Sequence, residues 1–225
     1  MSYTLQQGGI RLPEASLADR NVAAASKGHF TGHIVLGDGP GRITQIESHH
    51  ELKACLCLAV RPETDEIYEQ VGFKWYDEDG ELHTHYFDFV VVQTDGEVFA
   101  YSVRPSYGVT DAFFEEMCRI SDQARTEGFV TDVRLVTEED LDPVALFNAE
   151  LLHSIREEDP EADAAARKTV REMEGIETLE TLRDITGCGA MGFRALIRLI
   201  RSRNLQLVSY ERISPKSQVF KRELI

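Results

Sequence analysis

Residues 67–104 read IYEQVGFKWYDEDGELHTHYFDFVVVQTDGEVFAYSVR, and this stretch decides the fold class. It contains three runs at 67–76, 82–92 and 98–103 that are rich in β-branched and aromatic residues, as strands are. Asp79-Gly80 and Asp95-Gly96 separate the runs, and Asp-Gly pairs favour tight hairpin turns. The stretch therefore predicts an antiparallel meander of three strands.

The residues on either side of the meander predict helices. Residues 46–60 have apolar side chains at helical spacing, and Ser48 followed by Glu51 three positions later suggests a capping box at the helix start. Residues 110–127 predict an amphipathic helix, and 129–136 predict one more strand. The order helix, three strands, helix, strand indicates a mixed α/β fold.

The C-terminal part differs in pattern and charge from the rest. A short predicted helix at 179–185, a glycine-containing turn and a longer basic helix at 191–203 are followed by an alternating run at 205–213. This order is typical of a winged helix-turn-helix. We expect four parts: an N-terminal arm at 1–42, a mixed α/β domain at 43–140, an acidic helical connector at 141–176 and a winged-helix-like domain at 177–225.

Charge is spread unevenly along the 225 residues, whose formal net charge is −15. Residues 183–225 carry nine Lys and Arg against three Asp and Glu, whereas residues 1–182 carry fifteen against thirty-six. A small basic module can bind phosphates locally, because charges more than about 10 Å apart are screened. The acidic remainder leaves open a protein-interaction surface with no nucleic acid involved.

Composition limits the class of protein and its compartment. Hydrophobic residues make up 42% of the chain, which is enough for a core, and no apolar run is long enough to cross a membrane. No secretory signal is visible. The four cysteines lack zinc-ligand spacing, so we expect reduced, buried thiols in a cytoplasmic protein.

A carboxylate within an apolar strand is the first candidate for chemistry. Asp88 lies between aromatic neighbours, and burying it without a partner is costly. The next strand carries Ser102 and Arg104 on one face, since side chains alternate along a strand. With Glu51 on the preceding helix, these residues form the skeleton of a divalent-metal phosphodiesterase site. The alternative is a simple ion pair between Asp88 and Arg104 on neighbouring strands.

Five short motifs follow one another in this region with suitable spacing. They are Glu47-Ser48-His49-His50-Glu51, Tyr68-Glu69-Gln70, Asp77-Glu78-Asp79-Gly80, Phe87-Asp88-Phe89 and Ser102-Val103-Arg104-Pro105. Together they resemble the N-terminal domain of TnsA-type transposon endonucleases, members of the PD-(D/E)XK nuclease superfamily. The resemblance covers about residues 42–136, and the C-terminal part, including Ile213-Ser214-Pro215-Lys216-Ser217, is similar to the winged-helix domain that follows in that family.

The resemblance implies a role for each matching residue. Glu51 corresponds to the helix carboxylate and Asp88 to the central metal ligand, with the backbone carbonyl of Val103 as a further ligand. Ser102 stands in the place of a second acidic or amide ligand, and Arg104 in the place of the catalytic lysine. The implied cofactor is Mg²⁺, or Mn²⁺ in its stead. The implied partners are DNA, a DDE-type transposase and an ATPase regulator.

Two departures from the family pattern bear on cleavage. Ser102 is neutral and short, which makes it a poorer ligand for a hard cation than a carboxylate. Arg104 keeps the positive charge but does not give up a proton, and its planar fork has a different reach. Two functions therefore stay open: a transposon-end endonuclease with impaired cutting, and a catalytically inactive nuclease-fold scaffold or regulator that binds DNA or a protein.

Other motifs carry less information. Arg194, Arg198 and Arg201 recur at helical spacing, so with Lys216 they are candidate contacts for a DNA backbone, or else a solvated face. The histidines His49, His50, His83 and His85 could supplement a metal site, although surface positions are the more common use of such residues. The glycine-rich run 37–41 lacks the Lys-Ser or Lys-Thr of a phosphate-binding loop and predicts a flexible linker.

Overall fold

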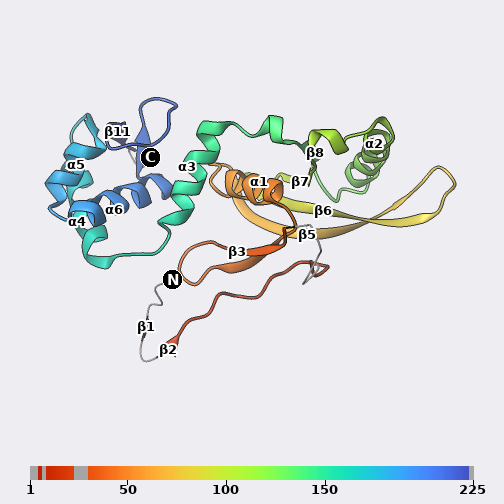
Figure 1. Cartoon of the computed structure of the whole chain (residues 1–225), viewed down its shortest axis with the longest axis horizontal. Coiled ribbons are helices and arrows are strands. Elements are labelled where there is room, and N and C mark those ends of the chain that lie inside the picture. The colour runs from red at the N-terminus through yellow and green to blue at the C-terminus, as the bar shows by residue number, and fades with distance from the viewer. Residues whose placement is uncertain (1–4, 7–8, 23–29, 223–225) are drawn as a thin grey trace. The chain divides into compact units, whose positions relative to one another are not determined.

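The computed structural model describes residues 5–6, 9–22 and 30–222, and it divides into two compact units. The first unit comprises Met1–Asp142 and the second Pro143–Ile225. Figure 1 shows the long strands of the first unit with helices α1 (His49–Ala59) and α2 (Asp111–Thr126), and the smaller, mostly helical second unit. The chain is thus a mixed α/β protein in which a mixed sheet is flanked by helices, as the sequence predicts at this coarse level.

The first unit is built on a four-stranded sheet with the order β5-β6-β7-β8. Its strands are β5 (Thr64–Tyr76), β6 (Leu82–Gln93), β7 (Val98–Val103) and β8 (Asp132–Val136). β5, β6 and β7 pair antiparallel, whereas β8 pairs with β7 in parallel. The predicted meander is confirmed, and the parallel strand makes the sheet mixed.

Glycine closes both hairpins of the meander, because the turns require a positive φ. Gly80 has φ 78° and Gly96 has φ 86°, a region that glycine adopts without steric cost. The N–H of Gly80 donates to the carbonyl of Asp77 at 3.2 Å, and that of Gly96 to the carbonyl of Gln93 at 2.9 Å. The Asp-Gly pairs therefore act as the sequence predicts.

Helix α1 (His49–Ala59) leads into the sheet and packs against β4 (Arg42–Ile46), β5, β6 and β7. The Ser48 side chain accepts the N–H of Glu51 at 3.0 Å, as an N-cap does. The second half of the predicted capping box is wrong, because the Glu51 carboxylate accepts the N–H of Glu47 at 2.8 Å rather than that of Ser48. This bond holds the Glu51 side chain over the first turn of the helix.

Helix α2 (Asp111–Thr126) covers a core cluster of the sheet. Met117, Ile120 and Ala124 are buried in one cluster with Phe73 and Phe87. Burial of such side chains stabilises a fold by roughly 1.5–3 kcal/mol each, so this contact anchors α2 against the sheet. The predicted amphipathic helix is confirmed. The 3-10 turn η1 (Ser106–Gly108) connects β7 to α2, and η2 (Glu138–Asp140) follows β8.

The N-terminal residues form part of the first unit. β3 (Gly32–Leu36) and β4 (Arg42–Ile46) pair as a hairpin, and β1 (Leu5–Gln6) pairs with β2 (Gly9–Ile10). Residue Glu14 bonds to this hairpin: its N–H donates to Gly41 and its carbonyl accepts from Ile43. The predicted boundary between an arm at 1–42 and a domain starting at 43 is wrong, since it falls inside the β3–β4 hairpin.

The second unit contains four helices and a three-stranded antiparallel sheet within its described residues. Its elements are α3 (Pro143–Ser154), α4 (Pro160–Glu172), β9 (Ile176–Thr178), α5 (Leu179–Thr186), α6 (Gly189–Arg201), β10 (Leu205–Leu207) and β11 (Gln218–Lys221). The sheet order is β10-β11-β9. Among the described residues, every helix is too short or too polar to cross a lipid bilayer.

The predicted connector at 141–176 is not a separate part of the chain. It contains α3 and α4, and α4 packs against both α5 and α6. Buried side chains of α4, such as Ala166 and Val170, explain this, because their apolar surface needs a partner. The acidic helices therefore belong to the same unit as the basic C-terminal residues.

Candidate functional site

Asp88 lies where β6 and β7 stop pairing. Their ladder runs from Val92 opposite Val98 to Phe89 opposite Tyr101 and ends there. Beyond this point a side chain replaces the backbone as hydrogen-bond acceptor: Oδ2 of Asp88 accepts the backbone N–H of Val103 at 2.7 Å. The strands thus separate around a half-buried carboxylate, which sequence alternation alone does not specify.

Gln70 approaches the other oxygen of Asp88 from β5. Its Nε2 donates to Asp88 Oδ1 at 3.4 Å. Gln70 is fully buried and has φ 51°, a left-handed conformation that a non-glycine residue rarely adopts. The β5–β6 ladder is interrupted at this residue, between Glu69 opposite Phe89 and Val71 opposite Phe87. The Asp88 carboxylate is therefore held between one backbone donor and one side-chain donor.

Glu51 is a second carboxylate whose charge acts on Asp88. It is only 5% exposed. The pKa of Asp88 is raised to about 7, mainly by burial and next by the charge of Glu51, although the bonds from Val103 and Gln70 and the charge of Arg20 act in the opposite direction. Burial also raises the pKa of Glu51. Such a pair favours an added positive charge, either a proton or a cation.

Arg104 points to α2 rather than to Asp88. The guanidinium carbon of Arg104 lies 4.2 Å from the ring centre of Phe113, a cation–π contact. Across the described residues, the ion pairs include none between Asp88 and Arg104. The simple interstrand ion pair considered from the sequence is therefore wrong, and the predicted substitute for a catalytic lysine is stacked on an aromatic ring.

Ser102 is buried and bonded to a histidine. Its Oγ lies 3.1 Å from Nε2 of His85, and the side chain is 3% exposed. Burial lowers the pKa of His85 to about 4, and the charges of Arg104 and Arg20 lower it too, so the ring is neutral at pH 7. His85 joins the site through Ser102, and the neighbouring Val103 is buried as well.

The other histidines lie elsewhere. His83 pairs with Asp77 at the β5–β6 hairpin, with its Nε2 2.7 Å from the Asp77 carboxylate. His49 stacks on Phe30 with ring centres 4.1 Å apart. His50 lies near enough to Glu138 for its charge to act on the pKa of that carboxylate. Among these four histidines, all in the described part of the chain, His85 is the one that contacts a residue assigned to the site from the sequence.

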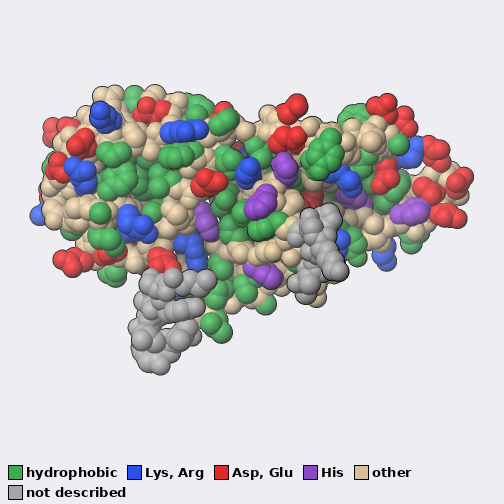
Figure 2. Space-filling view, in the orientation of Figure 1, with side chains coloured by type: hydrophobic (Ala, Val, Ile, Leu, Met, Phe, Trp, Pro, Cys, Tyr) green, Lys and Arg blue, Asp and Glu red, His purple; other side chains and the backbone are tan. Residues whose placement is uncertain are grey.

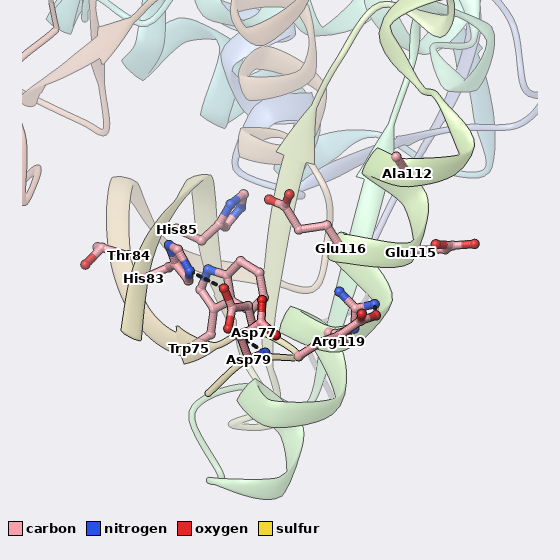
Figure 3. A pocket seen from close by; sticks show the side chains of 11 residues that line it. Trp75, Asp77, Asp79, His83, Thr84, His85, Ala112, Glu115, Glu116 and Arg119 are labelled. Carbon is pink, nitrogen blue, oxygen red and sulfur yellow. Dashed lines mark hydrogen bonds and ion pairs between the residues drawn. The ribbon is translucent and has the colours of Figure 1, made fainter. Parts of the chain in front are cut away.

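A pocket of about 540 Å³ lies between the β5–β6 hairpin and α2 (Figure 3). Figure 3 shows Asp77 and His83 joined at the hairpin, with Glu116 reaching across from α2 towards His85. Asp77, Glu81 and His83 bring ligand atoms within 4.8 Å of one another, a spacing that a metal ion could use. These side chains are largely exposed, and Figure 2 shows acidic side chains gathered at this hairpin tip.

Arg20 is the site residue that the sequence analysis misses. Its Nε donates to Gln70 Oε1 and its Nη2 to Glu47 Oε2, both at 2.6 Å. The guanidinium carbon also lies 5.0 Å from the ring centre of Tyr86. No periodicity or motif marks Arg20, because its partners lie 50 and 27 positions away in the chain.

The three candidate arginines of α6 differ in their surroundings. Arg198 is internal: its Nε donates to Asp163 Oδ1 at 2.7 Å, and both side chains are 10% exposed. The predicted exposed stripe of three arginines on α6 is therefore wrong at its middle member. Arg194 and Arg201 are half-buried, and Arg194 reaches the carbonyl of Ser154 at 3.5 Å.

The loop between β10 and β11 carries the remaining candidate. Lys216 is exposed there, next to Ser217, which is buried. The Ser217 Oγ accepts the N–H of Ser214 at 3.0 Å and shapes the loop. Lys216 thus lies on an ordered turn at the surface of the second unit.

The cysteines form no disulfides, as predicted, but only part of the burial prediction is confirmed. Cys55 and Cys57 are buried, whereas Cys118 is exposed and Cys188 half-buried.

No protein-family model matches the chain, and no curated protein matches it either.

Proposed function

We propose that the protein is a DNA-binding, nuclease-fold protein of a transposition system that binds a divalent metal ion at Glu51 and Asp88 and cleaves DNA weakly. The observation that carries the proposal is the Asp88 carboxylate at the point where β6 and β7 separate, with the buried Glu51 carboxylate acting on it. Two desolvated carboxylates without a balancing proton favour a hard divalent cation such as Mg²⁺.

The arrangement of the first unit supports the nuclease fold. Helix α1, strands β5, β6 and β7, helix α2 and strand β8 follow one another, and the sheet order is β5-β6-β7-β8. This is the order expected from the resemblance to PD-(D/E)XK nucleases. Glu51 falls on the helix, Asp88 on the second strand and Ser102 to Arg104 at the end of the third.

The donor set fits a divalent ion. Glu51 and Asp88 offer carboxylate oxygens, and the carbonyl of Val103 is the third oxygen that the resemblance assigns. When bound there, Mg²⁺ would supply positive charge to a scissile phosphate. The protein's own residues would orient Asp88 through Val103 and Gln70.

Weak cleavage follows from the two altered positions. Ser102 brings no negative charge, and its Oγ is already paired with His85. Arg104 is stacked on the ring of Phe113 on α2 and is not paired with Asp88. Removal of a positioned charge or proton-transfer group commonly costs 10²- to 10⁴-fold in rate, so we expect nicking to be slow by about this factor.

The second unit supports DNA binding. Its elements run α4, β9, α5, α6, β10, β11 with an antiparallel sheet, which is the element order of a winged helix. Nine Lys and Arg against three Asp and Glu in residues 183–225 give it a local positive charge. We assign Lys216 and Arg194 as DNA contacts, with a DDE-type transposase and an ATPase regulator as the partners.

A second candidate function is a catalytically inactive scaffold or regulator that binds DNA or protein on the same fold. It is favoured by the stacking of Arg104 on Phe113, because this contact leaves the position of the catalytic lysine without a free cation. Binding of Mn²⁺ without any nicking would select this candidate.

The deciding experiment is nicking of a supercoiled plasmid in Mg²⁺ and in Mn²⁺, alone and with the partner transposase. Wild type should nick slowly, Asp88→Ala should not nick, and Asp65→Asn should match wild type, because Asp65 is an exposed carboxylate on β5. Calorimetry with Mn²⁺ should show a site that Asp88→Ala removes. Absence of both nicking and Mn²⁺ binding in the wild type would refute the metal site.

A gel-shift assay at low salt tests the DNA-binding part separately. A shift that weakens with salt is expected. A flat response would instead favour an acidic protein-interaction surface, the alternative that the charge of residues 1–182 leaves open.

A further inference from the structure

Residues 11–22 lie against β4 and β5, next to the Glu51–Asp88 site. Ser16 donates to the buried carboxylate of Glu69 at 2.5 Å, and the N–H of Val22 donates to Gln45 at 2.9 Å. Between these contacts, Arg20 extends to Gln70 and Glu47. The segment is therefore bonded at several points along its length, and Arg20 has a fixed starting position.

Arg20 determines which end of the Gln70 amide faces Asp88. A guanidinium nitrogen only donates hydrogen bonds, so the Gln70 atom that lies 2.6 Å from Arg20 Nε must be the oxygen. The amide nitrogen of Gln70 then faces Asp88 Oδ1, at 3.4 Å. A reversed amide would place an oxygen against the carboxylate and a donor against Arg20, which is unfavourable at both ends.

Asp19, the residue before Arg20, holds the backbone of Gln70. The carbonyl of Gln70 accepts the N–H of Asp19 at 3.2 Å, and the carboxylate of Asp19 accepts the N–H of Gly72 at 2.8 Å. Gln70 has a positive φ and is missing from the β5–β6 pairing, whereas Gly72 lies opposite Tyr86, so Asp19 bonds to β5 on both sides of Val71. A left-handed residue inside a strand persists only where its surroundings enforce it, and such residues gather at functional sites.

We propose that Arg20 is a positioning residue of the Glu51–Asp88 site and that it acts through the side-chain amide of Gln70. Asp19 fixes the Gln70 backbone, Arg20 fixes its amide, and the amide fixes Asp88 from the side opposite Val103. The effect on metal binding rests on the function proposed above, whereas the orientation of Gln70 does not. The orientation of the Gln70 amide and the effect of Arg20 on metal binding can therefore be tested by separate experiments.

The first measurement uses the full-length protein in EDTA. The side-chain amide protons of Gln70 are followed by ¹H–¹⁵N NMR in wild type, Arg20→Met and Arg20→Lys, with Arg11→Met as the control because Arg11 is an exposed arginine of the same segment. Both Arg20 variants should shift the Gln70 signals and speed their exchange with water. The control should leave them unchanged. Unchanged signals in Arg20→Met overturn the proposal whether or not the protein binds metal.

The second measurement is Mn²⁺ affinity by calorimetry in a double-mutant design. Arg20→Met and Arg20→Lys should each weaken binding by about tenfold, as is usual when the partner of a metal-site residue is lost. Lysine should not rescue, because it lacks the planar fork that serves Gln70 and Glu47 together. In a Gln70→Met background, Arg20→Met should have almost no further effect, since the residue that transmits its influence is gone.

The outcomes separate the proposals. Full rescue by Arg20→Lys would show that charge alone matters and would overturn the positioning role. Tighter Mn²⁺ binding in Arg20→Met would also overturn it, because Arg20 would then compete with the metal. Glu47→Gln provides a second test that leaves the Gln70 contact in place, and it should keep the Gln70 signals of the wild type. If the wild type binds no Mn²⁺, the metal site fails and the NMR result alone decides the role of Arg20.

Discussion

The backbone N–H of Val103 donates to the carboxylate of Asp88 at 2.7 Å, where β6 and β7 would otherwise continue to pair. The Asp88 side chain accepts a hydrogen bond where a backbone carbonyl would do so in a regular ladder. The charge of Glu51 acts on the same carboxylate and raises its pKa. The end of the β6–β7 pairing therefore fixes the position of the carboxylate whose pKa is raised.

Stability of the metal-free protein should fall as pH rises because of Asp88. Burial raises the pKa of Asp88 from 3.8 to about 7, so between these values the folded state binds more protons than the unfolded state. Under linkage, stability then decreases with rising pH in this window and levels off above it. Asp88→Asn should remove this component and raise the melting temperature at pH 8 in EDTA by about 5 °C.

Melting curves of wild type and Asp88→Asn from pH 4 to pH 8 in EDTA measure the difference. Asp65→Asn serves as the control, because it removes an exposed carboxylate from the same sheet. Parallel pH dependences of wild type and Asp88→Asn would contradict the raised pKa. Mn²⁺ should reverse the trend in wild type only, since metal binding requires the ionised carboxylate.

Disruption of the Arg198–Asp163 ion pair should unfold the second unit more easily. Asp163 Oδ2 also accepts the N–H of Asp159 at 2.9 Å, so the carboxylate is bonded on both oxygens. Removing one partner leaves a buried charge, and Arg198→Met should cost about 3–5 kcal/mol in the free energy of unfolding. Urea denaturation measures this. A loss below about 1 kcal/mol, the value of an exposed pair, would show that the contact is solvated.

DNA affinity should depend on Lys216 through salt. Lys216 is exposed on the β10–β11 loop, so it can contribute one phosphate contact. Lys216→Ala should weaken binding for all sequences alike and reduce the slope of log affinity against log salt by about 1. Fluorescence anisotropy at several salt concentrations gives the slope. Lys168→Ala, an exposed lysine on α4, is the matched control, and an equal effect of both variants would mean that only net charge matters.

Local sequence signals predict most of the elements correctly. The meander and α2 follow from alternation, Asp-Gly turns and helical spacing, which depend on neighbouring residues. The predicted strand at 205–213 ends at Leu207, because its partner β11 offers only four residues for pairing. Alternation alone does not reveal the length of a partner strand.

The site is predicted less completely, because its decisive contacts are distant in sequence. The charge of Glu51 raises the pKa of Asp88, but Arg20 contacts Gln70 over 50 positions and Arg198 contacts Asp163 over 35. The helical spacing of Arg198 in the sequence is the same whether its side chain is exposed to water or bonded to a buried carboxylate such as Asp163. Arg104 could likewise not be placed, since Phe113 competes with Asp88 for its guanidinium.

Under the proposed function, placing at positions 102 and 104 the residues of the TnsA-type endonucleases that the sequence resembles should increase cleavage. In the double variant Ser102→Glu with Arg104→Lys, a third carboxylate joins Glu51 and Asp88, and lysine gives up the stacking of a planar guanidinium on Phe113. We expect Mg²⁺-dependent plasmid nicking to rise by about 10²-fold over wild type. Adding Asp88→Ala should abolish the gain.

The same variant gives an independent reading through stability. Position 102 is 3% exposed, so a glutamate there should lower the melting temperature in EDTA, and Mn²⁺ should restore it by binding the folded state. Restoration by Mn²⁺ together with nicking would place the defect at Ser102 and Arg104. A variant that is restored by Mn²⁺ but does not nick would place it elsewhere, in the contacts that orient Asp88. Failure of Mn²⁺ to restore stability would contradict the assignment of residue 102 to the metal site.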